Sequence, residues 1–481
     1  MGEIRIQISN IRISPPVSTN QISNCLRKQE IKMANQTMKE RLLYTTTTDD
    51  RSRMRAVANN LILHLHPTKV PKRALRFSYT WGLGGISTIL ALLLIITGVL
   101  LMFRYDASIE RAYTSIQYLE TQVMFGSLIR AVHHWSANLL VITAFLHMLR
   151  VFFTGGFLKG RSTNWIIGIV LLLLVVAFNF TGYLLPWDQL AYWAITVGTS
   201  LLSYIPLIGT AVSNFLLGGP EVGQGTLRNF YAIHVAVLPA TMIVLMSYHF
   251  WKVRKDGGIS QPEPPIGENG KRERIERVTT IPHLVQIELA ATAVLLTAII
   301  IWSIFVPAPL EELANPAHPP NPAKAAWYFM GLQELLLHMH PLATLLLPGI
   351  ILGALIALPY WDKQEDQIGV YFRSVIGKQT ALVGIILSII LIPLLVLIDE
   401  WWLDLPALLP TWPTLISNGL LPLLLSLGAL AAIYKALRKL FTASRSEAVV
   451  GLFTFIMVSL IVLTIIGVYF RGANMALIWP V

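Results

Sequence analysis

Long runs of apolar residues dominate the chain after residue 80, whereas residues 1–60 are polar and charged. A run of about 18 or more apolar residues can cross a bilayer as a helix, and the runs in this chain predict nine spans. We expect them at about 81–103, 128–152, 165–185, 229–252, 283–306, 342–360, 380–398, 415–437 and 448–470. Residues 1–60 lack the apolar run of a signal peptide and are expected to form a disordered tail. The pattern therefore predicts an all-α polytopic membrane protein.

The composition agrees with this pattern and excludes an ordinary soluble enzyme. Apolar residues make up 54% of the 481 residues and charged residues 13%, whereas soluble chains carry about 25% charged residues. Because Cys25 is the only cysteine, the chain cannot form an internal disulfide, a cage of thiolate ligands or a CxxCH haem attachment.

The Lys and Arg residues are distributed unevenly between the two sides of the predicted membrane region. Connections after the odd-numbered spans carry 4 of them, connections after the even-numbered spans carry 17, and the segment before the first span carries 14. Basic residues concentrate on the cytoplasm-like, negative side of a membrane. The N-terminus is therefore expected on that side, and an odd number of spans places the C-terminus on the other.

Four histidines lie at matched depths on the second and fourth predicted spans. His133 and His147 are 14 residues apart, which places them within about 40° of one helix face and about 21 Å apart along the axis. His234 and His249 are 15 residues apart, within about 60° of one face and about 22 Å apart. Both spans run from the outer to the inner surface, so His133 is level with His234, and His147 with His249.

Ionisable side chains inside a membrane are costly, and inward-facing side chains of a helix bundle commonly build cofactor sites. The matched depths predict two stacked haems, each held by two histidines. The alternative is four separate helix–helix hydrogen bonds, which leaves the matched depths to coincidence. His134 points elsewhere on its helix and is expected at a haem edge, a propionate or a neighbouring helix.

Glycines recur at the same interval on the first and third spans. Gly84 and Gly98 are 14 residues apart, as are Gly168 and Gly182. A porphyrin that lies against a helix needs a residue without a side chain at that depth. Close helix packing through small residues is the alternative explanation.

Two arginines are candidate partners of haem propionates. Arg130 stands one turn before His133 near the outer surface, and Arg254 follows His249 near the inner surface, together with Lys255. Charge-assisted hydrogen bonds suit a guanidinium and a propionate. Simple interfacial anchoring is the alternative for Arg254 and Lys255.

Several segments resemble the cytochrome b subunit of quinol-oxidising cytochrome bc complexes, and most closely its four-helix photosynthetic type. They are IRAVHHWSANLLVITAFLHMLRVFFTGGF (129–157), NFTGYLLPWDQLAYWAITVGT (179–199) and YAIHVAVLPATMIVLMSYHFWKVRKDGGIS (231–260). The rear half resembles the companion subunit of that type in PLEELANPAHPPNPAKAAWYF (309–329). The resemblance runs from about residue 60 to 400 and implies a fusion of both subunits.

The predicted domains combine this resemblance with a Pro- and Gly-rich charged segment at 252–278, which is the best internal boundary. They are a tail (1–60), a dihaem four-helix cytochrome b domain (61–256), a basic linker (257–281), a companion-subunit-like domain (282–400) and a two-helix extension (401–481). The extension lies outside the resemblance and is expected to face lipid or a partner. Trp479 and Pro480 in its tail are typical of an interfacial anchor.

The resemblance implies a function in energy-transducing membranes. His133 and His234 resemble the iron ligands of the outer haem, and His147 and His249 those of the inner haem. Residues 186–199, including Trp187, resemble one border of an outer quinol-oxidation pocket. Trp327 and Tyr328 resemble the segment that closes it. The implied reaction sends one electron from quinol to an iron–sulfur partner and the other through both haems to an inner quinone, with proton translocation.

The implied partners are a Rieske iron–sulfur protein, a c-type cytochrome, quinone and membrane lipid, in a homodimeric complex without nucleic acid. The family commonly places Pro-Glu before the Trp-Tyr pair, and its Glu is thought to accept a quinol proton. Here Ala325 and Ala326 replace both residues. Because proton transfer needs an acceptor within hydrogen-bond reach, Glu334 is the predicted substitute, and a solvated interfacial carboxylate is the alternative.

The photosynthetic type also carries a cysteine that holds an additional, covalent haem early in its first helix. Gly82 stands at the corresponding position, so no covalent haem is expected on this chain. Two other functions remain open. A dihaem membrane anchor of a dehydrogenase or hydrogenase needs neither the LLPWDQ segment nor nine spans. A proton-coupled transporter predicts interrupted helices and an internal repeat, and neither is found in the sequence.

Overall fold

The computed structural model describes residues 66–264, 273–364 and 367–479. Within them, nine helical spans are long and apolar enough to cross a membrane, which confirms the predicted all-α membrane fold. They are α6 (Leu83–Met102), α8 (Gly126–Phe153), α9 (Ser162–Tyr183), α12 with α13 (Gln224–Ala232 and Leu238–Lys255), α14 (Val285–Phe305), α16 (Pro341–Trp361), α17 (Val375–Trp401), α19 (Leu421–Leu440) and α20 (Arg445–Tyr469). The predictions for residues 1–60, Cys25 and Pro480 lie outside the described residues.

Shorter elements that the hydrophobic pattern did not predict lie before the first span and between the spans. The short helices are α5 (Phe77–Thr80), α7 (Ala112–Gln122), α10 (Gln189–Leu202), α11 (Gly209–Leu217), α15 (Met330–His338) and α18 (Leu405–Leu408). Strands β1 (Lys69–Pro71) and β2 (Arg277–Thr279) pair antiparallel and tie the segment before α5 to the segment before α14. At α10, the Asp188 side chain accepts a hydrogen bond from the Ala191 amide, which is the reason that the helix begins there.

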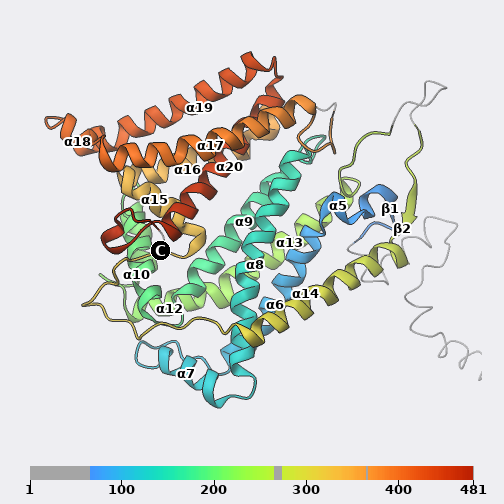
Figure 1. The fold of residues 1–481 in the computed structure, drawn as a ribbon. Helices are drawn as coiled ribbons and strands as arrows, with labels where there is room; N and C mark the ends of the chain where they lie inside the picture. The colour runs from blue at the N-terminus through green and yellow to red at the C-terminus, as the bar shows by residue number, and fades with distance from the viewer. Residues whose placement is uncertain (1–65, 265–272, 365–366, 480–481) are drawn as a thin grey trace, which may run out of the picture.

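The front half forms a bundle in which α6 packs on α8, α8 on α9, and α9 on α13 (Figure 1). One buried residue from each helix meets in its apolar centre, namely Leu90, Val141, Val175 and Met242. Because these helices are apolar on most sides, their outer faces suit a lipid environment.

The fifth span, α14, packs with the front bundle although it follows the charged linker in sequence. It contacts α8 and α6 and runs along the edge of the bundle (Figure 1). The Trp135 indole nitrogen donates to the Val306 carbonyl oxygen at 2.8 Å. The sequence boundary at 252–278 is therefore not a boundary in space.

Helix α20 is the most buried of the candidate spans, which differs from the expectation that it faces lipid or a partner, whereas α19 of the same extension is largely unburied. It packs against α15, α17 and α19, and Phe453 stacks on Phe152 of α8 with ring centres 3.8 Å apart. Small residues permit this packing, since a methyl group added to Gly384 of α17 would lie 2.5 Å from the Gly451 carbonyl oxygen of α20. Trp479, beyond α20, is exposed.

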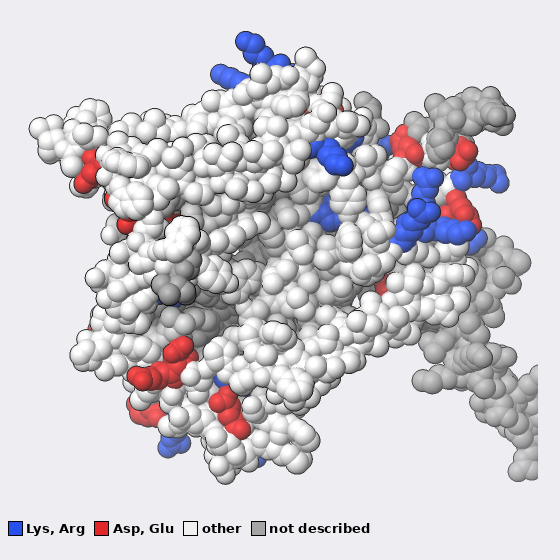
Figure 2. Space-filling view, viewed as in Figure 1, with Lys and Arg blue, Asp and Glu red and all other residues white. Residues whose placement is uncertain are grey.

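Charged residues gather at two ends of the molecule. In Figure 2, most Lys and Arg lie near β1, β2 and the C-terminal end of α19, where some Asp and Glu accompany them, and another group of Asp and Glu lies over the end with α7 and α12. The wide surface between these ends is almost free of charge, as expected for a membrane-embedded belt.

Candidate functional site

The four predicted histidines form two facing pairs inside the front bundle. The ring centres of His133 and His234 are 6.4 Å apart, and those of His147 and His249 are 6.5 Å apart. His133 and His147 lie on α8, His249 lies on α13, and His234 lies in a π-helical turn (Ile233–Val237) between α12 and α13. The histidines that the sequence predicted at equal depths in the membrane therefore face each other in the structure.

The spacing within each pair fits an axially coordinated metal. A metal–imidazole bond is about 2 Å long, so one metal between two coaxial rings separates the ring centres by about 6 Å. Both pairs meet this separation, and neutral imidazole is a common ligand of haem iron. The bundle therefore offers two equivalent positions, at different depths, for a metal between two imidazoles.

The π-helical turn explains why the two histidine intervals differ. A π turn inserts one additional residue into a helix, so an interval of 15 across it has the geometry of 14 in a regular helix. Pro239, the second residue beyond this turn, has no amide hydrogen to continue the regular pattern. The insertion gives His234 and His249 the same relation as His133 and His147.

Two threonines orient the outer histidine pair. The Thr97 hydroxyl donates its hydrogen to the Leu93 carbonyl oxygen at 2.7 Å and lies 2.9 Å from His133 Nδ1. Since that hydrogen is committed, His133 Nδ1 donates and its Nε2 keeps a lone pair for a metal. Thr181 repeats the arrangement at 3.0 Å from His234 Nδ1. In contrast, His249 Nδ1 is buried and has no hydrogen-bond partner within the described ranges.

Each predicted glycine lies opposite one histidine. A methyl group added to Gly84 would lie 3.2 Å from His147 Cε1, and one added to Gly98 would lie 3.3 Å from His133 Cε1. The distances are 2.6 Å from Gly182 to His234 and 3.8 Å from Gly168 to His249. The group that approaches these glycines in the structure is the imidazole ring, and their role beside a porphyrin stays a prediction.

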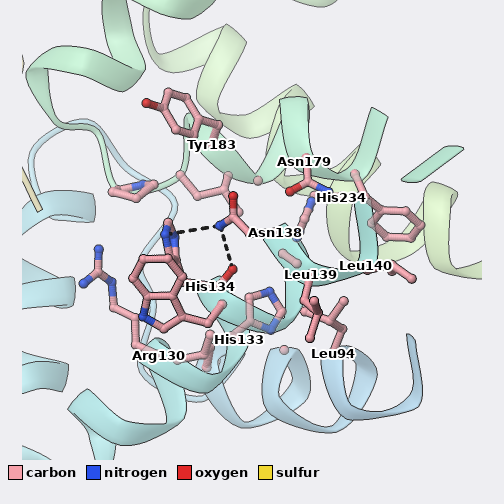
Figure 3. Close-up of a pocket in the computed structure, with 18 of the residues that line it drawn as sticks. Leu94, Arg130, His133, His134, Asn138, Leu139, Leu140, Asn179, Tyr183 and His234 are labelled. Carbon is pink, nitrogen blue, oxygen red and sulfur yellow. Dashed lines mark hydrogen bonds between the residues drawn. The ribbon is translucent and has the colours of Figure 1, made fainter. Parts of the chain in front are cut away.

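A large cavity surrounds the outer pair (Figure 3). Its volume is about 990 Å³, and its walls are mainly apolar. The residues that line it include Gly98, Arg130, His133, His134, Gly182, His234, Trp327 and Tyr328. Predicted residues from both halves of the sequence therefore meet in one cavity.

His134 contributes a polar group to this cavity. In Figure 3 a dashed line joins the Asn138 side chain to the His134 ring, and Asn138 Nδ2 is 3.3 Å from His134 Nε2. The Trp327 indole nitrogen donates to Asn138 Oδ1 at 2.7 Å. The chain His134–Asn138–Trp327 links α8 to the segment before α15, a connection that the sequence did not reveal.

A second, smaller cavity of about 250 Å³ adjoins the first. The two cavities share Tyr183, Leu190, Ala325, Ala326 and Tyr328 in their walls. Helix α10 closes the smaller cavity with Trp193 and neighbouring apolar residues, and α15 closes it with residues that include Gln333. Burial raises the pKa of the Tyr328 hydroxyl, so this group is neutral.

Two predicted catalytic residues, Trp187 and Glu334, line neither the large nor the small cavity. Trp187 is 7% exposed and packs in an apolar cluster with Tyr192, whereas its neighbour Pro186 lines the large cavity. Glu334 is fully buried, and its carboxylate binds the Arg471 guanidinium at 2.7 Å. These positions do not support direct catalytic roles for Trp187 and Glu334, because each side chain faces other protein groups.

Other acidic residues do line the large cavity, and the sequence prediction missed them. They are Asp188 and Glu311, and the Glu311 amide donates to Asp188 Oδ2 at 3.2 Å. Burial raises the pKa of Asp188, although its hydrogen bonds from backbone amides oppose this effect. Glu311 is exposed, so it connects the cavity wall with the surface.

The arginines have defined surroundings. Arg130 is 7% exposed, contacts Glu120 and donates to the Ala308 and Pro309 carbonyl oxygens at 3.0 and 2.6 Å, so it also fixes the loop after α14. Arg150, which the sequence prediction missed, is buried one turn beyond His147, and its Nε has no hydrogen-bond partner within the described ranges. This nitrogen makes Arg150 a candidate for an acidic group near the inner pair, while the role of Arg254 on α13 stays a prediction.

Comparisons with known proteins place the chain in one family. The family model described as "Cytochrome b/b6/petB" matches residues 69–257. Cytochrome b6 of Porphyra purpurea is 40% identical over 214 residues, which cover 44% of this chain and 96% of that protein. Cytochrome b6 of Prochlorococcus marinus (strain MIT 9215) is 45% identical over 180 residues, which cover 37% and 82%. A chain of a solved "Hyperthermophilic respiratory Complex III" aligns with a TM-score of 0.61 at 22% identity, covering 87% of this chain and 96% of that chain.

The fold and the paired histidines therefore define a polytopic membrane protein of electron transfer. The chain belongs to the cytochrome b/b6 family, which implies binding of b-type haem. The solved structure extends the shared fold over most of the chain, beyond the part covered by the cytochrome b6 relatives.

Proposed function

We propose that this chain is the cytochrome b subunit of a Rieske/cytochrome b complex that oxidises quinol at its outer side. The observation that carries the proposal is the pair of equal ring separations, 6.4 and 6.5 Å, at two depths of one bundle. The proposed overall activity is quinol:cytochrome c oxidoreductase, or the same reaction with an equivalent acceptor.

Two b haems, when bound, supply one-electron carriers at two depths and so connect the outer cavity with an inner quinone site. His133 and His234 would hold the outer haem, and His147 and His249 the inner one. Arg130, Arg150 and Arg254 are the candidate partners of their propionates.

The smaller cavity is the proposed position of the quinol head group. Its apolar wall from α10 suits an aromatic ring, and Tyr328 and Gln333 offer the hydrogen-bonding groups that orient such a ring. Because Tyr183 and Tyr328 border both cavities, a quinol there would lie beside the outer histidine pair.

The proposed partners are a Rieske iron–sulfur protein, which takes one electron from each quinol, and a c-type cytochrome, in a homodimeric complex. The likeness to a chain of a respiratory Complex III supports a multisubunit assembly. The uneven distribution of Lys and Arg supports an N-terminus on the negative side of an energy-transducing membrane.

Optical spectra and redox titration of the purified chain test the proposal. Two b-type components are expected, and His133→Leu should remove one of them. His134→Leu is the matched control, since this neighbouring residue on α8 should leave both components in place. A single component in the wild type would favour a different class of cytochrome, and no component would favour the transporter alternative.

Quinol oxidation requires a separate measurement, because a dihaem membrane anchor would show similar spectra. The complete complex should reduce its outer haem when quinol is added, and an inhibitor of the inner quinone site should not prevent this first reduction. Absence of any quinol-driven reduction would contradict the proposed reaction even if both haems are present.

A further inference from the structure

The end of the chain is attached to the loop that precedes Trp327. Lys324 Nζ donates to the Val468 carbonyl oxygen at 2.8 Å, and Asn321 Nδ2 donates to Asn474 Oδ1 at 2.8 Å. Figure 1 shows this red C-terminal segment beside α15. We call Val468, Arg471 and Asn474 the C-terminal clamp.

Arg471 is the buried centre of the clamp. Its Nε and Nη2 donate to Glu334 Oε1 at 3.0 and 2.7 Å, and the two side chains are 1% and 0% exposed. Its Nη1 donates to Glu400 at 2.8 Å and to the Met475 carbonyl oxygen at 3.0 Å. One guanidinium therefore connects α15, α17 and the tail beyond α20.

The planar shape of arginine matters for these contacts. Its nitrogens donate in fixed directions, so it can serve a carboxylate through two of them and still reach other acceptors. A lysine is a point charge on a flexible chain and cannot reproduce all these bonds. Breaking the Arg471–Glu334 ion pair would also leave the buried Glu334 carboxylate without this cationic partner, which costs free energy.

The clamp acts on the wall that the two cavities share. Helix α15 follows directly after the Trp327–Phe329 turn. Its Gln333 side chain accepts from the Ala325 amide at 2.6 Å and donates to the Ala323 carbonyl oxygen at 2.7 Å. The loop and α15 therefore form one hydrogen-bonded unit. Arg471 binds this unit through its ion pair with Glu334 of α15.

We propose that Arg471 is a positioning residue for the outer quinol cavity and that the C-terminal clamp fixes the Ala325–Tyr328 wall. The inference rests on the proposed quinol oxidation for its kinetic consequence, but not for its structural one. The clamp also gives a function to the tail beyond α20, which lies outside residues 69–257 of the family match.

Hydrogen exchange of the complete complex tests the structural part without any turnover. In Arg471→Gln, amides of residues 321–333 should exchange faster while both b-type spectra persist. Arg445→Gln is the control, because Arg445 is exposed at the start of α20, at the end of the helix that is far from Arg471. Unchanged protection of 321–333, or equal loss of protection throughout the chain, would overturn the inference.

Asn321→Ala removes an exposed contact of the clamp, and it should produce a smaller increase in the same segment even if Arg471→Gln does not assemble.

Steady-state kinetics with a soluble quinol analogue test the functional part. Arg471→Gln should raise KM about tenfold with a smaller change in kcat, and Arg471→Lys should recover only part of the loss. Glu334→Gln should have the same effect, and the double variant should be no worse than either single variant.

Loss of kcat in Glu334→Gln together with normal kinetics in Arg471→Gln would instead make Glu334 a proton acceptor. A wild type that does not oxidise quinol would refute the proposed function, while the exchange experiment would still decide on the clamp.

Discussion

Single residues decide how closely the helices of the front bundle approach the histidines. The four glycines share one sequence interval, but their surroundings differ, because a methyl group added to Gly182 would lie 2.6 Å from His234 and one added to Gly168 would lie 3.8 Å from His249. The spacing along the chain was sufficient to predict these positions. The spacing could not predict which glycine position tolerates an added methyl group, since that depends on how α9 packs on α13.

Gly182→Ala should therefore damage the outer site, whereas Gly168→Ala should be tolerated. A methyl group at 2.6 Å must displace the His234 ring, and one at 3.8 Å makes an ordinary contact. Redox titration should show loss or a shift of one b-type component in the first variant and two unchanged components in the second. Equal behaviour of the two variants would contradict the geometry.

Acidic residues at the large cavity offer a second test at this scale. Glu311 lines the cavity and reaches the surface, whereas the neighbouring Glu312 is exposed and does not line it. If Glu311 accepts a quinol proton, Glu311→Gln should lower kcat on the order of 100-fold, with the pH profile altered, and Glu312→Gln should not. Full activity of Glu311→Gln would exclude it as the acceptor and leave Asp188 as the remaining acidic candidate of the wall.

At the scale of elements, α15 depends on charged partners rather than on apolar packing alone. His338 Nδ1 lies 2.6 Å from Asp399 of α17, and Glu334 and Arg471 complete its surroundings. Burial by itself would lower the pKa of His338, but the hydrogen bonds to Asp399 and Glu334 outweigh it and raise the pKa to about 9.

This raised pKa predicts a pH-dependent contribution to stability. Protonated His338 stabilises the fold below its ordinary pKa of 6.5, and the contribution is lost as the pH rises towards about 9. His338→Gln should therefore be less stable than the wild type by on the order of 2 kcal/mol at pH 6 and nearly equal to it at pH 10. Thermal unfolding followed by circular dichroism at both pH values would measure the difference, and an equal gap at both would count against the charged histidine.

At the scale of the whole molecule, α20 joins the two halves of the chain. It packs closely on α17 through Gly384 and Gly451, and it contacts α8 through Phe453. The hydrophobic pattern identified α20 as a span but could not rank it as the most buried one, because its sequence is apolar on all faces.

Gly451→Leu should consequently separate α17 from α20 and reduce the yield of assembled protein. A methyl group at Gly451 would already lie 2.8 Å from Thr380 Cβ, so a larger side chain requires a backbone shift. Gly428→Leu is the matched control, since an added methyl group at that position of α19 has nothing within 4 Å. Size-exclusion profiles in detergent should show aggregation for Gly451→Leu alone.

The sequence by itself determined the nine spans, the depths of four histidines and the glycines that accompany them. These features follow from local periodicity, because a helix of known rise converts residue spacing into height and direction. The tertiary structure alone decided which rings face each other, why an interval of 15 equals one of 14, and that α20 is central. It also decided that Arg471 forms an ion pair with the buried Glu334. An ion pair between distant segments depends on how helices pack, and no local sequence pattern encodes that arrangement.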